Sequence, residues 1–139
     1  MSSVQRERLH SECYGMSADE KSARLSFLAT EYALYTAARS RCDNEAAWGH
    51  LERAHIVAQV LFWAHIGSHW EMLQFAWHVR DWREVAGQIA RLMLAPVGNG
   101  LGRLPIGNSG RARISAFSPM PIPDDLRSEI ARFSEAGRS

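Results

Sequence analysis

The chain has 139 residues, of which 46% are hydrophobic and 22% charged. This composition suits one globular domain and argues against disorder along the whole chain. Sixteen basic residues stand against fifteen acidic ones, a formal net charge of +1, so the charge balance excludes nucleic acid and anionic membranes as the main partner. The two cysteines, Cys13 and Cys42, are too few for a disulfide framework and lack the paired spacing of a zinc knuckle.

We recognise no targeting or membrane segment in the sequence. Charged side chains such as Arg6, Glu7 and Arg8 stand where a secretory signal needs an apolar stretch. The most apolar run, Ile56 to Ile66, is interrupted by two polar residues and reaches about half of the ~20 residues that a membrane span needs. We therefore expect a cytoplasmic protein that does not bind membranes.

Two helices are predicted in the first half of the chain. Ser17 and Glu20 form a capping box, and the apolar residues behind it recur at spacings of three and four, which predicts a helix near residues 18–41. The turn at residues 42–44 supplies the next N-cap. A second helix is predicted near residues 45–66.

Two further helices are predicted before the composition changes. Gly67 is typical of a left-handed helix end, so we expect the chain to reverse there and a third helix to follow near residues 69–79. Asp81 caps a fourth helix near residues 82–95, which Pro96 is expected to end. The predicted inner face of this fourth helix consists of Val85, Ile89 and Leu92.

The rest of the chain predicts an irregular segment and a last helix. Residues 96–123 are rich in Gly, Pro, Ser and Asn but interleaved with apolar residues, which favours an ordered strap across the helices. A short helix is predicted near residues 124–135. We therefore expect one all-α domain over residues 17–139, with antiparallel hairpins as in a tetratricopeptide-like array or a bundle, after a flexible segment at residues 1–16.

Three histidines stand out because they occupy otherwise apolar helix faces: His55, His65 and His69. A buried imidazole without a partner costs about 1–3 kcal/mol. A single core histidine is typically satisfied by a neighbouring hydrogen-bond acceptor, but a cluster repeats the cost and favours a shared ligand.

The predicted helices restrict which of these histidines meet. On one straight helix His55 and His65 lie about 15 Å apart and cannot bind the same ion. The expected reversal at Gly67 brings His65 close to His69. The same reversal places His55 level with His78, and the earlier turn near Cys42 places it level with Glu31. Together they predict a layer in the middle of the bundle that contains Glu31, Glu52, His55 and His78.

These residues indicate a metal site. Glu52 and His55 have the Glu-x-x-His spacing of di-iron bundles, but a single copy of it argues against a di-iron centre. The hypothesis is one zinc, copper, nickel or iron ion, in metal handling or in a metalloenzyme of unknown reaction, with ligands from His55, His65, His69, Glu52 and Glu31. Gln59 is expected either to orient an imidazole or to serve as a core amide, and Arg53 to pair with Glu52 or Glu31.

The second hypothesis is an interaction module. The chain has five tryptophans, and Trp63 and Trp70 lie off the main apolar stripe, where they predict an exposed patch for a homodimer or another protein. The histidines would then be structural. A third hypothesis, a histidine acting as a general base without a metal, lacks a nucleophile or an oriented acid beside any histidine.

The run from His50 to His55, together with Gln59, His65, the segment 69–73 and the strap segment 105–110, resembles a bacterial family catalogued as domain of unknown function 3703. The resemblance covers roughly residues 17–126. Because members of that family occur beside heavy-metal resistance and transport genes, the resemblance implies metal handling. The family's motif residues correspond here to Glu52, Arg53, His55, Gln59, His65 and His69.

Overall fold

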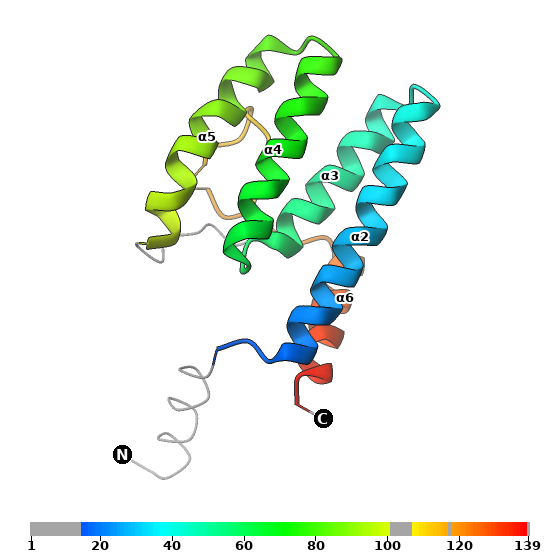
Figure 1. Cartoon of the computed structure of the whole chain (residues 1–139), viewed down its shortest axis with the longest axis vertical. Coiled ribbons are helices and arrows are strands. Elements are labelled where there is room, and N and C mark those ends of the chain that lie inside the picture. Colours follow the sequence, from blue (N-terminus) through cyan, green and yellow to red (C-terminus); the bar gives the residue numbers. More distant parts are fainter. Residues whose placement is uncertain (1–14, 101–106, 117, 139) are drawn as a thin grey trace.

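The computed structural model describes residues 15–100, 107–116 and 118–138, and this part of the chain is all-α. The helices are α2 (Ala18–Ser40), α3 (Asn44–Ala58), α4 (Phe62–His78), α5 (Trp82–Gly100) and α6 (Asp124–Ala136). Figure 1 shows α2 to α5 side by side, while α6 returns to lie along the N-terminal half of α2. None of the described helices is long and apolar enough to cross a membrane.

The predicted helix starts are set by side-chain caps. Ser17, Asp43 and Asp81 each accept a hydrogen bond from the backbone N–H three residues further on, at 3.1, 3.0 and 3.0 Å. These bonds satisfy N–H groups that have no partner within the helix. The positions of α2, of the start of α3 and of the start of α5 therefore agree with the sequence prediction to within one residue.

The predicted reversal at Gly67 is wrong. Helix α3 already ends at Ala58, the chain turns at residues 59–61, and α4 runs through Gly67 without interruption. Leu61 precedes α4 without a side-chain cap, so the turn has no sequence signature. Gly67 behaves as an ordinary helix-interior glycine, which helices tolerate at a modest cost in stability.

The core lies between consecutive helices and under α6. Phe75 of α4 is at its centre, with its ring 4.9 Å from Trp48 and 5.5 Å from Tyr35 in edge-to-face contacts. A second cluster forms where Leu126 and Phe133 of α6 pack against α2 and α3. The C-terminal end of α3 is therefore held within this second cluster.

The strap, defined here as residues 107–116 and 118–123, contains no helix or strand. Pro96 does not end α5, which continues to Gly100; a proline inside a helix removes one backbone hydrogen bond without forbidding the next turn. Asn108 organises the strap by donating to the carbonyls of Ser115 and Ser118, both at 2.8 Å. Residues 101–106, predicted to belong to the strap, and most of the predicted flexible segment 1–16 lie outside the described residues.

The position of Gly67 inside α4 generates the first prediction. A Cβ at Gly67 meets no atom within 4 Å, so Gly67→Ala is expected to raise the free energy of unfolding by about 0.5–1 kcal/mol, as alanine does in a helix interior. Urea unfolding followed by circular dichroism measures this change. Gly49→Ala, in equally open space on α3, serves as the matched control, and a loss of stability confined to Gly67→Ala would contradict a continuous α4.

Candidate functional site

The site lies where α3 and α4 meet. His65 and His69 are four residues apart on α4 and therefore share one face of that helix. His55 belongs to the last turn of α3, and the reversal at residues 59–61 places it level with His65 on the antiparallel neighbour. The early end of α3 therefore unites His55 with His65, a pair that one straight helix would hold apart.

His55, His65 and His69 form what we call the histidine cluster. Their ring centroids are 4.9, 4.6 and 4.9 Å apart, which makes a nearly equilateral triangle of mutually tilted rings. Each residue offers a ring nitrogen, and these nitrogens lie within 4.8 Å of one another. All three side chains are buried, with 2–4% of their surface exposed.

The tautomer of His55 follows from Ser68. The Ser68 hydroxyl donates its single proton to the carbonyl of His65, with an O–O distance of 2.6 Å. It must therefore accept at the other contact, 2.9 Å from Nδ1 of His55. Nδ1 of His55 then carries the proton, which leaves the lone pair on Nε2 available to a ligand.

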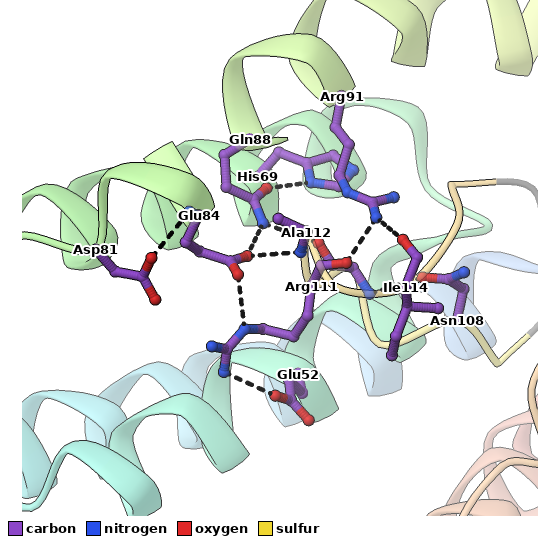
Figure 2. Close-up of polar contacts among 11 residues, drawn as sticks. Glu52, His69, Asp81, Glu84, Gln88, Arg91, Asn108, Arg111, Ala112 and Ile114 are labelled. Atoms are coloured by element: carbon purple, nitrogen blue, oxygen red, sulfur yellow. Dashed lines mark hydrogen bonds and ion pairs between the residues drawn. The ribbon is translucent and has the colours of Figure 1, made fainter. Parts of the chain in front are cut away.

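The tautomer of His69 follows from α5 (Figure 2). Nδ1 of His69 lies 2.8 Å from Oε1 of Gln88, whose amide nitrogen donates to Glu84 and to the carbonyl of Gly110, both at 2.8 Å. The Gln88 oxygen must therefore accept from His69. Again Nδ1 holds the proton and Nε2 holds the lone pair. A buried carboxylate, that of Glu84, thus supports His69 through one intervening amide.

His65 differs from its two neighbours. Its Nδ1 atom is buried and has no hydrogen-bond partner among the described residues. A buried polar atom without a partner costs about 1–3 kcal/mol, so such atoms in a native protein call for an explanation. A ligand bound among the three rings would explain this atom, because an imidazole nitrogen can bind a metal ion.

Burial keeps the cluster neutral. It lowers the pKa of His65 to about 4, and it lowers that of His69 to about 4 although the bond to Gln88 acts in the opposite direction. The pKa of His55 lies well below its ordinary value, first because of burial and then because of His69, His65 and Arg91. At neutral pH the cluster therefore presents unprotonated imidazoles, the form that binds metals.

The strap covers the cluster at Gly110. This residue has a φ of +81°, and a Cβ there would lie 2.8–3.0 Å from the ring of His55, so the backbone packs directly against the imidazole. Arg91 of α5 holds the same segment by donating to the carbonyls of Arg111, at 2.6 Å, and Ile114 (Figure 2). The strap thus contacts α3 through His55 and α5 through Arg91.

The structure does not bring the predicted carboxylate ligands into the cluster. Glu31 is buried and binds Nε of Arg53 at 2.9 Å and Nδ1 of His50 at 2.7 Å. Glu52 accepts from Arg111 at 3.2 Å, and burial raises its pKa while Arg111 acts in the opposite direction. Within the described residues, the group of nearby metal-ligating atoms contains the three histidines and no carboxylate. The predicted layer through His78 is wrong, because His78 is the last residue of α4, well beyond His65 and His69 on the same helix.

The two predicted supporting residues hold other parts of the structure. Arg53 forms the ion pair with Glu31 and a second one with Asp125 of α6. Gln59 accepts from the backbone N–H of Gly107 at 3.2 Å and donates to the carbonyl of Asn108 at 3.4 Å. Gln59 is therefore a buried amide, as one of its two predicted roles requires, but it connects the α3–α4 turn to the strap and not to a neighbouring helix.

Sequence reasoning missed the polar row on α5. Glu84, Gln88 and Arg91 are all buried, spaced by four and three residues on one helix face. Glu84 accepts from the backbone N–H of Ala112 at 2.9 Å and lies 3.2 Å from Nε of Arg111 (Figure 2). Their spacing by four and three residues places them on one face of the helix and could have indicated a buried polar row. Val85, Ile89 and Leu92 have the same spacing, and the sequence predicts this apolar stripe as the inner face instead.

The contact at Gly110 generates a prediction. Gly110→Ala is expected to lower the free energy of unfolding by about 2–3 kcal/mol, because alanine disfavours a positive φ by about 1–2 kcal/mol and its Cβ would also overlap the His55 ring. Urea unfolding measures the change, with Gly49→Ala as the control that has open space around it. Equal effects of the two substitutions would show that the strap does not pack on His55.

The lowered pKa values generate a pH prediction. Histidine in an unfolded chain titrates near 6.5, whereas His65 and His69 titrate at about 4 in the folded chain. Between these values the unfolded chain binds more protons, so the stability is fully present above pH 6.5 and is lost as the pH falls. From pH 6.5 to 5 we expect a loss of about 1.5 kcal/mol per buried histidine.

Urea unfolding in the presence of a chelator tests this pH dependence. His65→Gln is expected to lose part of it, whereas His78→Gln, which replaces an exposed histidine, should retain it. Stability that stays constant from pH 8 to pH 5 would mean that the histidines are protonated alike in both states.

Comparison with known proteins agrees with the resemblance seen in the sequence. A family model described as a protein of unknown function (DUF3703) matches residues 22–130, which include all three histidines and the whole of the described strap. No curated protein and no solved structure matches the chain. Since the match covers more than half of its residues, the chain belongs to the DUF3703 family.

Proposed function

We propose that this protein binds one transition-metal ion through the imidazoles of His55, His65 and His69. The observation that carries the proposal is the convergence of three buried ring nitrogens within 4.8 Å of one another. Without a ligand, neutral imidazoles in such a cluster leave polar atoms without partners. One metal ion bound among the rings accepts a lone pair from each of them and gives all three nitrogens a partner, which removes the free-energy cost of leaving them unpaired.

The hydrogen bonds around the cluster support the same function. Histidine ligands of metals typically donate their second ring N–H to an acceptor that fixes the tautomer and the orientation of the ring. Ser68 provides that acceptor for His55, and Gln88, supported by Glu84, provides it for His69. Two of the three rings are thus already held with Nε2 free, so little orientation remains to be fixed when a metal binds.

The donor set restricts the metal. Imidazole suits zinc, copper, nickel and iron, whereas magnesium and calcium require oxygen ligands. Ligands at about 2.1 Å from an ion lie roughly 3.4 Å from one another, so nitrogens that lie within 4.8 Å of one another need to approach by about 1.4 Å at most. Because the described cluster contains no carboxylate or thiol, the proposal is metal binding, as in metal handling, and assigns no reaction.

Metal titration of the untagged, chelator-treated chain tests this proposal. We expect one equivalent of zinc or cobalt, or of copper under reducing conditions, and a higher melting temperature, because a ligand at about 100 times its Kd stabilises the native state by ~2.7 kcal/mol. Cobalt adds a visible spectrum that reports nitrogen ligation. Less than about 0.1 equivalent of every metal, with an unchanged melting temperature, would contradict the proposal.

Matched variants separate the histidine cluster from other histidines and from the carboxylates. His65→Gln is expected to weaken binding at least about 100-fold, more than loss of a supporting residue does. His50→Gln and His78→Gln should retain binding because both lie outside the cluster. Glu52→Gln should also retain it, since Glu52 pairs with Arg111. Loss of metal from Glu52→Gln with full binding by His65→Gln would assign the site to other residues.

The alternative function is an interaction module with structural histidines. It is favoured by the exposure of Trp63, Trp70, Trp77 and Trp82. In that case the variants at His65 would lose stability without any change in metal content, which the same titration detects.

A further inference from the structure

Helix α5 differs from an ordinary surface helix because it buries several polar side chains and exposes most of its apolar ones. Its buried side carries Glu84, Gln88 and Arg91, which hold the strap and His69. Its predicted inner residue Ile89 is instead half exposed, so that part of the sequence prediction is wrong. Among the exposed side chains described on α5, only Arg83 is charged; the others are Trp82, Ala86, Ile89, Ala90, Met93, Leu94 and Val97.

The apolar surface continues onto α4. Trp77 contacts Trp82 edge-to-face at 5.2 Å, and Trp70 stands two turns before Trp77 on the same side of α4. Between the helices lies a groove of about 430 Å³, lined by Trp70, Leu73, Trp77, Val85 and Ile89, among others. We call this surface, which spans Trp70 and Trp77 of α4 and the exposed residues of α5 from Trp82 to Val97, the α4–α5 face.

This surface is large enough for a stable interface. Trp70, Trp77 and Trp82 are each more than half exposed, and Met93 is 75% exposed. With roughly 150–250 Å² available from a large aromatic side chain, the face offers on the order of 800 Å², the area that each partner buries in a standard interface. Monomers rarely expose contiguous apolar patches of this size.

We propose that a second copy of this chain covers the α4–α5 face in a two-fold symmetric dimer. At spacings of four residues α5 exposes Trp82, Ala86, Ala90 and Leu94, so two small side chains lie between two large ones and the helix is complementary to itself. If two copies of α5 cross antiparallel at Ala90, the small Ala86 of each chain faces the large Leu94 of the partner subunit. Ile89 and Met93 then flank the crossing point, beside the groove formed by the tryptophans.

The charge of this face disfavours a lipid surface as the occupant. Helices that lie on membranes carry many Lys and Arg residues along their polar side. Here the opposite side of α5 is buried against the strap, and Arg83 is the single exposed charge among the described side chains of that helix. A symmetric contact made mostly of uncharged side chains instead suits an isologous dimer, the commonest oligomer of soluble proteins.

The mass of the full chain in solution tests this proposal. Light scattering after size exclusion, at about 10–100 μM, should give twice the monomer mass of 15.6 kDa. Met93→Glu is expected to give the monomer mass because it buries a charge in the contact. The matched control is Leu34→Glu, on an exposed position of α2 that is 44% accessible, which should remain dimeric.

Circular dichroism of each variant checks that it is folded, and metal titration of Met93→Glu should be unchanged because the substitution lies outside the histidine cluster. A wild-type monomer at every concentration would overturn the proposal, as would a dimer that persists in folded Met93→Glu. Binding of a monomeric wild type to phosphatidylcholine or phosphatidylglycerol vesicles would assign the face to lipid instead and would also overturn it.

Cross-linking tests the position of the two-fold axis. In a background in which Cys13 and Cys42 are replaced by serine, Ala90→Cys should be joined to its own copy by a short bismaleimide. Leu34→Cys, at another exposed position, on α2, should remain uncross-linked. Efficient cross-linking through Leu34→Cys but not through Ala90→Cys would contradict a dimer that crosses at Ala90.

Discussion

The amide of Gln88 is the contact on which the rest of this structure depends. Its oxygen accepts from His69, and its nitrogen donates to Glu84 and to the strap carbonyl of Gly110. One buried side chain therefore fixes the tautomer of a histidine, holds a carboxylate and positions the backbone that packs on His55. Gln88 thus joins His69, α5 and the strap in one buried hydrogen-bond network, and each satisfied member of such a network strengthens the others.

This network has a consequence for the outside of the molecule. A helix of average composition buries its apolar residues, but α5 needs Glu84, Gln88 and Arg91 inside to hold the strap. Apart from the buried Val85, most of its apolar residues then point outward, where Ile89 and Met93 remain accessible. The same requirement that orders the site therefore creates the α4–α5 face. A partner on that face would shield α5 on the side opposite to the site.

Helix starts could be predicted from the sequence because they depend on local hydrogen bonds, whereas the turn between α3 and α4 could not because it depends on tertiary contacts. Ser17, Asp43 and Asp81 cap helices through bonds three residues away, so their positions can be read from the chain alone. The turn at residues 59–61 has no such cap, and Gln59 is held there by strap residues almost fifty positions later. The false reversal at Gly67 followed from this gap, and with it the separation of His55 from His65.

The three histidines could be singled out from the sequence because burying an imidazole without a partner is costly. Glu31 and Glu52 were expected to be metal ligands, but in the structure each has a cationic partner instead. Arginines take both carboxylates: Arg53 pairs with Glu31 and Arg111 with Glu52. Arg91 adds a positive charge that lowers the pKa of His55 further. The imidazoles are thus kept neutral and without a carboxylate beside them at neutral pH. An ion that enters it displaces no proton, so the binding energy need not be used to deprotonate the ligands.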